Sequence, residues 1–272
     1  MAASGAAGIA AAGAAAGGNG GNGAGGGGGA GIAGSGTSGG SNVAGAGGVA
    51  AGGTSGSSGV GGAAGADGCS YKLCEGFEGL APGAPSSDFA IDVDKKGTVV
   101  ETNTSKAHSG THSVHVKVSD MAGVFGYITE SKSLAATGAS FWGRVFLWSE
   151  VATPNGHIVN IAVDGKTGTA SEQVRILNVI GNHLATNRRS DDAGKGSNVT
   201  PPTGKWSCYE WHITPTDLHV FLEGTELPIA ETWVEPTLSL VRLGFERFTA
   251  GSAGDLWLDD VAINDTQIGC AK

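Results

Sequence analysis

The chain changes in composition at about residue 68. More than half of its 50 glycines lie before that point, among alanines and serines, and no charged residue precedes Asp67. Such a segment holds too little apolar surface to offset the entropy lost on ordering. Residues 1–68 are therefore predicted to form a disordered low-complexity linker. Residues 69–272 are left to form the folded domain, and their number suits a single unit with a sizeable core.

The folded part is acidic. The chain has 16 Lys and Arg against 25 Asp and Glu, which gives a net charge of −9, and its basic residues form no cluster. Nucleic acids and anionic membrane surfaces are poor partners for such a protein, because their negative charge would find no matching positive surface. No apolar run of about 18 residues outside the linker predicts a membrane-spanning helix. We expect a monomer that contacts neither nucleic acid nor membrane.

The hydrophobic pattern after the linker has a period of two residues, which is typical of half-buried strands. In residues 113–118, three valines alternate with outward-facing His115 and Lys117. The other predicted strands are 124–129, 141–148, 157–163, 173–180, 208–213, 218–222, 238–245 and 256–263. Short strands separated by turn residues, with no long helical period, predict two antiparallel sheets packed face to face as a β-jelly-roll sandwich.

A jelly roll presents alternate side chains of its concave sheet to solvent, where a polysaccharide chain can lie. The predicted strand 141–148 is informative, since one of its sides carries Trp142, Arg144, Phe146 and Trp148. Two readings stay open for this side. It forms a cleft wall, or it forms a packed core edge from which the arginine reaches solvent.

The four cysteines allow three disulfide pairings. Cys69 and Cys74 are close enough for a small local loop, which would leave Cys208 for Cys270. No CxxC pair suggests a zinc site. Disulfides indicate an oxidising compartment, yet residues 1–18 lack the basic segment of a signal peptide. We expect an extracellular or cell-surface protein whose export signal is not visible in this sequence.

Eight short strings, taken together, resemble one protein family. They are EGFE at 75–78, AHSGTHS at 107–113, GRV at 143–145, VRI at 174–176, NRRSDD at 187–192, WSCYEWH at 206–212, LWLDDV at 256–261 and IGC at 268–270. In order and spacing they resemble the cellulose-induced (Cip-type) secreted jelly rolls, which are similar to glucuronan lyases. The resemblance covers nearly all of residues 74–270. It implies a jelly roll, an extracellular location and a cleft for acidic polysaccharide, and it supports a bond between Cys208 and Cys270.

The resemblance also implies a structural calcium ion. Its ligands would be the carboxylates of Glu78 and Asp259 and the main chains of Ser109 and His112. Two acids brought together from distant strands repel each other unless a cation lies between them. The alternative is that both acids are ordinary surface residues at strand ends, where water solvates them.

Lyase chemistry on a uronic acid chain needs a group that neutralises the carboxylate, a base and an acid. Arg144 and Arg175 are candidate neutralisers, and the resemblance offers His157 as a base and Asp192 as an acid in the cleft. Asn178 and Trp142 are further candidates for contact with the substrate.

Two positions depart from the family. Gln173 stands where the family has a histidine, and Phe248 stands where it has a tyrosine, so two proton carriers are missing. We therefore expect a calcium-stabilised jelly roll that binds an acidic plant or microbial polysaccharide. The alternatives are an active polysaccharide lyase that works by β-elimination with His157, and a non-catalytic structural or adhesive protein of the cell surface.

Overall fold

The computed structural model describes residues 69–271, apart from 82, 84–87, 95–97, 151–155, 233–236 and 252. The predicted linker, residues 1–68, lies outside this part. The described chain is almost entirely β-structure, with one four-residue helix, α1 (Leu134–Thr137). No helix in the described residues is long and apolar enough to span a membrane.

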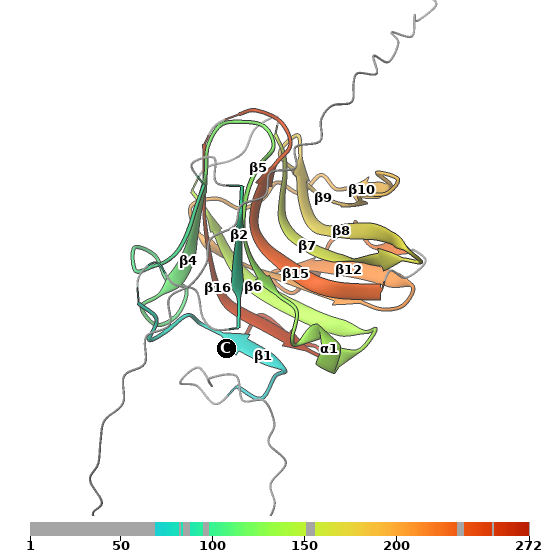
Figure 1. The fold of residues 1–272 in the computed structure, drawn as a ribbon, viewed down its shortest axis with the longest axis horizontal. Helices are drawn as coiled ribbons and strands as arrows, with labels where there is room; N and C mark the ends of the chain where they lie inside the picture. The colour runs from blue at the N-terminus through green and yellow to red at the C-terminus, as the bar shows by residue number, and fades with distance from the viewer. Residues whose placement is uncertain are drawn as a thin grey trace, which may run out of the picture. The chain divides into compact units, whose positions relative to one another are not determined.

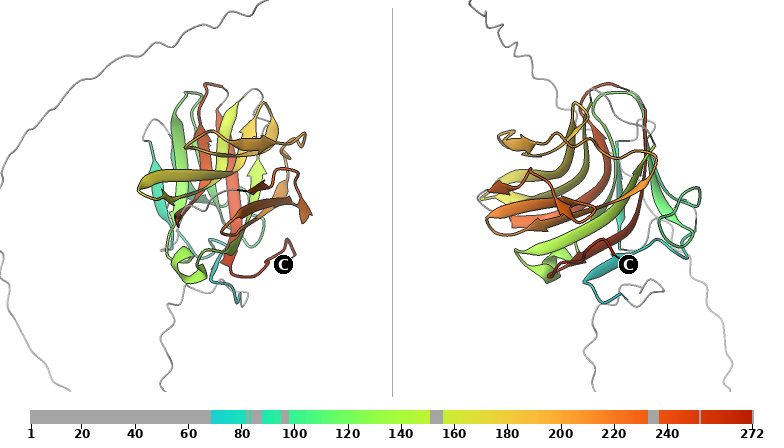
Figure 2. Two further views of the ribbon diagram at one scale, coloured as in Figure 1. Left: turned by 90° about the vertical axis from the view of Figure 1, so that its right-hand side faces the viewer. Right: turned by 180° about the vertical axis from the view of Figure 1, so that it is seen from behind.

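The strands form two antiparallel sheets, as predicted, and curve strongly (Figures 1 and 2). Sheet A runs β13-β12-β11-β6-β16-β4-β3, with β1 paired to β16 and β14 to β12. Its strands are β1 (Leu73–Glu75), β3 (Val99–Asn103), β4 (Ser113–Val118), β6 (Phe141–Ser149), β11 (Trp206–Ile213), β12 (Asp217–Leu222), β13 (Thr225–Glu226), β14 (Glu231–Thr232) and β16 (Gly254–Asn264). Sheet B runs β10-β9-β8-β7-β15-β5-β2. Its strands are β2 (Ala90–Val93), β5 (Val124–Glu130), β7 (His157–Thr167), β8 (Ala170–Ile180), β9 (His183–Arg188), β10 (Gly194–Gly196) and β15 (Thr237–Arg247).

The core lies between the two sheets and follows the alternation of the strands. Val114, Val116 and Val118 of β4 are fully buried, as the period-two pattern predicts. In β6, the side that contains Val145 and Leu147 joins the core cluster. The opposite side of β6 therefore belongs to the outer face of sheet A, which answers the question that the sequence left open for this strand.

Both disulfides link the predicted partners, Cys69 with Cys74 and Cys208 with Cys270. Cys208 is fully buried in β11, so its bond fastens the C-terminal segment to the middle of sheet A. Disulfides of this kind persist in oxidising compartments, in keeping with an extracellular protein.

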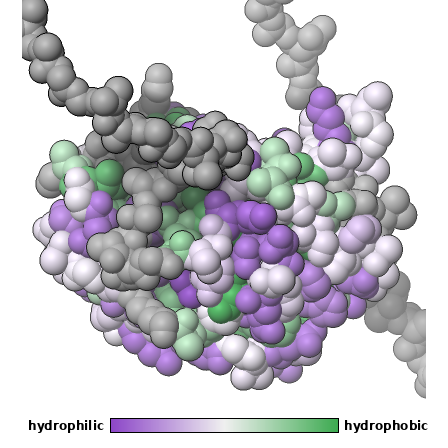
Figure 3. All heavy atoms as spheres, turned by 90° about the horizontal axis from the view of Figure 1, so that it is seen from below, coloured by the Kyte–Doolittle hydropathy of each residue, from purple (hydrophilic) through white to green (hydrophobic). Residues whose placement is uncertain are grey.

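The surface is largely polar. The side that faces downward in Figure 1 is mostly hydrophilic, with hydrophobic residues in small separate groups (Figure 3). Among the described residues, the large hydrophobic side chains with the greatest exposure, 40–47%, lie on separate segments: Ile91, Val99, Met121 and Ile180. No broad apolar surface in this part of the chain marks a protein interface.

Candidate functional site

A chain of polar side chains crosses the outer face of sheet B. It begins at Arg242 of β15, whose Nε donates a hydrogen bond to Asp164 Oδ2 of β7 over 2.6 Å. Its Nη1 donates to Asp92 of β2. Burial alone would lower the pKa of Arg242, but the hydrogen bonds to Asp92 and Asp164 outweigh burial and raise it. Strands from both sides of β15 therefore hold this guanidinium group.

The same chain continues to the far edge of the sheet through Gln173. Its Nε2 donates to Asp164 Oδ1 over 3.1 Å, and its Oε1 accepts a hydrogen bond from Arg175 Nε over 3.1 Å. Arg175 Nη1 donates to Asn187 Oδ1 of β9 over 3.4 Å and lies 3.7 Å from Asp192 Oδ1. Asn187 Nδ2 in turn donates to Asp192 over 3.2 Å. Successive hydrogen bonds thus join β2, β15, β7, β8 and β9, and we call this set of residues the sheet B network.

A second pair on this face is Tyr127 of β5 and Glu246 of β15. The Tyr127 hydroxyl donates to Glu246 Oε2 over 2.9 Å, and Tyr127 is only 1% exposed. Burial and then the Glu246 carboxylate raise the pKa of Tyr127 well above its usual value, so its hydroxyl keeps its proton. The sequence analysis missed this pair. Alternation within the predicted strand 124–129 could have placed Tyr127 opposite to the buried Ile128, but not beside Glu246.

Three candidates from the sequence lie together on sheet B: His157, Arg175 and Asp192. Phe248 lies between the first two, because its ring centre is 4.5 Å from that of His157 and 4.4 Å from the Arg175 guanidinium carbon. Arg175 is buried, whereas the Asp192 side chain is 81% exposed. A ligand can therefore reach the carboxylate before it reaches the guanidinium group.

The structure does not bring Arg144 and Trp142 to this group, because both lie on the outer face of sheet A. Arg144 donates to the carbonyls of Gly269, over 3.1 Å, and Asp260, over 3.4 Å, and burial lowers its pKa. Trp142 stacks on His212, with ring centres 4.3 Å apart. Their predicted placement in one cleft with Arg175 is therefore wrong: they lie on sheet A, whereas Arg175 lies on sheet B. The side chain of Asn178 lies outside the described part of β8.

A hollow of about 270 Å³ opens beside the end of the sheet B network. Asn187, Asp192 and Lys195 contribute polar groups to its lining, and Ile180 contributes an apolar one. It lies along β8, β9 and β10, so it extends the polar face toward the sheet edge.

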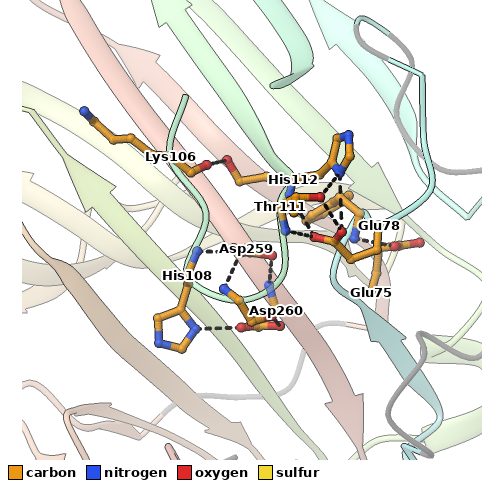
Figure 4. A network of polar contacts seen from close by, with 11 residues as sticks. Glu75, Glu78, Lys106, His108, Thr111, His112, Asp259 and Asp260 are labelled. Carbon is orange, nitrogen blue, oxygen red and sulfur yellow. Dashed lines mark hydrogen bonds and ion pairs between the residues drawn. The ribbon is translucent and has the colours of Figure 1, made fainter. Parts of the chain in front are cut away.

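The predicted calcium ligands lie around a single turn, residues 106–112 (Figure 4). Glu78 Oε1 accepts hydrogen bonds from the main-chain N–H groups of Thr111, over 2.7 Å, and His112, over 2.8 Å. Although burial acts in the opposite direction, these bonds lower the pKa of Glu78.

Asp259 holds the same turn from the other side. Its Oδ2 accepts hydrogen bonds from the main-chain N–H groups of His108, over 2.7 Å, and Ser109, over 3.1 Å. The side chain is fully buried in β16. Burial, and after it the adjacent Asp260 carboxylate, raises the pKa of Asp259 to about 7. The sequence analysis thus brought together two acids that do meet around one loop.

The two carboxylates offer hard oxygen atoms, which calcium prefers, and in this structure the main-chain N–H groups of the turn donate hydrogen bonds to them. Within the described residues, no group of three or more His, Cys, Asp or Glu side chains is arranged to hold a metal ion. Calcium bound here would therefore need main-chain carbonyls beside the two acids. The nearby histidines each face a separate carboxylate, His108 that of Asp260 and His115 that of Asp255, and so share no metal site.

Residues 77–266 match the Cip1-like core domain of the polysaccharide lyase-like proteins. The chain belongs to this family. No curated protein sequence matches it. Among solved structures, the cellulose-induced protein Cip1 is 22% identical with a TM-score of 0.62, over 73% of this chain and 100% of Cip1. An endo-β-1,4-glucuronan lyase from the fungus Trichoderma reesei is 10% identical with a TM-score of 0.54, over 72% and 96% of the two chains. SCLam, an endo-β-1,3(4)-glucanase, is 11% identical with a TM-score of 0.51, over 71% and 89%.

These similarities establish a shared Cip1-like jelly roll. The chemistry of the site has to be inferred from the side chains of this protein. On sheet B, Gln173 and Phe248 both contact Arg175. Neither side chain can carry a proton at neutral pH. Both side chains therefore hold the guanidinium group of Arg175 in place.

Proposed function

We propose that this protein is an extracellular polysaccharide-binding jelly roll, which holds a glycan chain on the outer face of sheet B. The observation that carries the proposal is the sheet B network, which places carboxylate, amide and guanidinium groups in sequence across five strands. Membership of the Cip1-like, polysaccharide lyase-like family supports a carbohydrate ligand.

Sugar hydroxyls both donate and accept hydrogen bonds, so a face that offers both kinds of partner suits them. Asp92 and Asp192 have side chains that are 41% and 81% exposed and can accept bonds from hydroxyls. Arg175, which lies beside Asp192, is held in place by Gln173, Asn187 and Phe248. A binding face formed in advance loses little entropy when the ligand docks.

Binding without cleavage is favoured over β-elimination by the nature of the side chains. A lyase needs a group that removes a proton and one that returns it. Gln173 and Phe248 supply neither, and the raised pKa of Tyr127 opposes its use as a base. His157, the base that the sequence analysis proposed, packs its ring against Phe248.

We further propose that calcium stabilises the fold at the turn 106–112. Glu78 and Asp259 would bind it through their carboxylates, and Ser109 and His112 through their main chains. Bound calcium would supply the positive charge that lets the buried Asp259 carboxylate ionise. This role is structural, since Asp259 lies on β16 of sheet A, the turn 106–112 leads into β4 of the same sheet, and none of these residues is on sheet B.

The full-length protein can be tested by affinity electrophoresis through gels that contain neutral or acidic polysaccharides, with ultraviolet absorbance of unsaturated uronates as a second readout. We expect retardation without product. Asp192→Ala removes an exposed ligand group and should weaken binding about tenfold, as expected for a hydrogen bond to a charged group. Trp142→Ala on sheet A is the matched control and should bind normally.

Three outcomes would contradict the proposal. Loss of binding in Trp142→Ala with normal binding in Asp192→Ala would move the site to sheet A. Product formation that His157→Ala abolishes would favour the lyase. No retardation by any polymer would favour a structural or adhesive role.

A further inference from the structure

We infer that the outer face of sheet B selects uncharged glycans over uronate-containing ones, an inference that rests on the proposed function. The resemblance to glucuronan lyases led us to expect an acidic polymer. The charges of the face itself oppose that expectation. Its polar groups contain four carboxylates and two guanidinium groups, so they carry an excess of two negative charges: Asp92, Asp164, Asp192 and Glu246 against Arg175 and Arg242.

Arg242 is already neutralised within the protein. Asp164 and Asp92 bind its Nε and Nη1 atoms from two different strands, and its guanidinium carbon lies 5.6 Å from the centre of the Tyr127 ring. A uronate that binds this guanidinium group has to share it with two carboxylates that already balance its charge, or displace one of them. Sharing brings like charges together, and displacement leaves a carboxylate without its charged partner in a half-buried place; both oppose binding.

Arg175 is held in a similar way. Its Nε and Nη1 atoms already donate to Gln173 and Asn187, and Asp192 lies on its exposed side, 3.7 Å away. The Phe248 ring packs 4.4 Å from the guanidinium carbon. A uronate that approaches from solvent therefore meets the Asp192 carboxylate first, and like charges repel.

The nearest lysines on this sheet lie at its margins. Lys166 is the second-last residue of β7, next to the hairpin with β8. Lys195 is on the edge strand β10, where it donates a hydrogen bond to the Ala230 carbonyl. Neither lysine lies beside Arg242. In the register of β15 with β7, Lys166 faces Thr237, whereas Arg242 faces Ala162. The middle of the face thus offers a neutral sugar many hydrogen-bond acceptors and offers a uronate no unpaired arginine.

The test uses pairs of oligosaccharides that have the same linkage and length and differ only at C6, where a hydroxymethyl group replaces a carboxylate. Cello-oligosaccharides with glucurono-oligosaccharides form one pair, and manno-oligosaccharides with mannurono-oligosaccharides form another. Titration calorimetry of the full-length protein at constant ionic strength should give at least tenfold tighter binding of the neutral member of a pair.

Asp92→Asn separates charge pairing from other causes of selectivity. It is nearly isosteric, the side chain is 41% exposed, and it frees one face of Arg242. We expect it to raise the ratio of uronate affinity to neutral-sugar affinity severalfold, because both ligands lose the same hydrogen-bond acceptor but only the uronate loses a like charge. Asp265→Asn is the matched control, because it makes the same charge change at a surface acid that pairs with Lys72.

The outcomes separate the inference from the proposed function. Equal or tighter binding of the uronate member would overturn the selectivity and leave polysaccharide binding intact. An Asp92→Asn protein with an unchanged ratio of uronate to neutral-sugar affinity, or an equal gain of this ratio in Asp265→Asn, would overturn the charge-pairing explanation. Failure to bind either member of any pair would overturn the proposed function and the inference with it.

Discussion

Arg175 and Gln173 lie on the same side of β8, and Arg175 Nε donates a hydrogen bond to Gln173 Oε1 over 3.1 Å. Both side chains are buried. Since a buried donor that loses its acceptor is costly, Gln173→Ala should lower the free energy of unfolding by about 1–3 kcal/mol. Urea denaturation measures this change. Asp192→Ala, at an exposed side chain of the same network, should change stability by less than about 0.5 kcal/mol. Equal effects would show that Gln173 does not support Arg175.

The calcium proposal predicts a response to chelation. Ligand bound only by the folded state adds about 2.7 kcal/mol when its concentration is a hundred times Kd. For a domain of this size, that corresponds to a fall in Tm of about 5–10 °C when the calcium is removed. Differential scanning calorimetry with and without chelator measures the shift. In Asp259→Asn the chelator should have little effect on Tm. An unchanged Tm in the wild-type protein would show that calcium does not stabilise the fold.

The pH dependence of stability in the calcium-free protein follows from Asp259. Its pKa is about 7 in the folded state against a usual value of 3.8, so between these values the folded state binds the proton more tightly than the unfolded state. This group therefore contributes most to stability below about pH 4, and its contribution is lost as pH rises through about 7. Relative to Asp259→Asn, the wild-type Tm in chelator should fall between pH 5 and pH 8.

Saturating calcium should abolish this relative fall with pH, because a bound cation favours the ionised carboxylate, and it should keep the wild-type Tm above that of Asp259→Asn. If the wild-type Tm instead rose relative to Asp259→Asn over the same pH interval, the assigned shift of the Asp259 pKa would be wrong.

The local alternation of apolar and polar residues was sufficient to predict the strands that bury one face. The predicted strand 113–118 has the bounds of β4, because its three valines alternate with polar residues. Each of the other eight predicted strands overlaps an observed one, with ends that extend by a few residues. Among the strands that were missed, β2 and β10 are short and lie at the two ends of sheet B, and β9 has only two apolar residues, Leu184 and Ala185, so its pattern is weak.

Sheet membership could not be predicted in this way. Alternation separates the two sides of a strand, but which sheet each strand joins depends on pairings between distant segments. β6 pairs with β11 and β16, and β8 pairs with β7 and β9. The contact between Tyr127 and Glu246 likewise needs the register of β5 against β15. Only the resemblance to a known family linked Glu78 to Asp259 across the chain.

The two disulfides differ in the lengths of the loops that they close, and this difference predicts their effects on stability. Cys208 and Cys270 are 62 residues apart, and Cys69 and Cys74 are 5 residues apart. In the chain-entropy model the long loop is worth about 4 kcal/mol and the short one about 2 kcal/mol. The double variant Cys208→Ala/Cys270→Ala should therefore unfold at a lower guanidinium concentration than Cys69→Ala/Cys74→Ala. Cys208 is also fully buried, so its truncation adds a packing loss to the entropic one. A larger destabilisation in Cys69→Ala/Cys74→Ala would mean that β1, which pairs with β16, is held by the short-loop disulfide more than by its strand pairing.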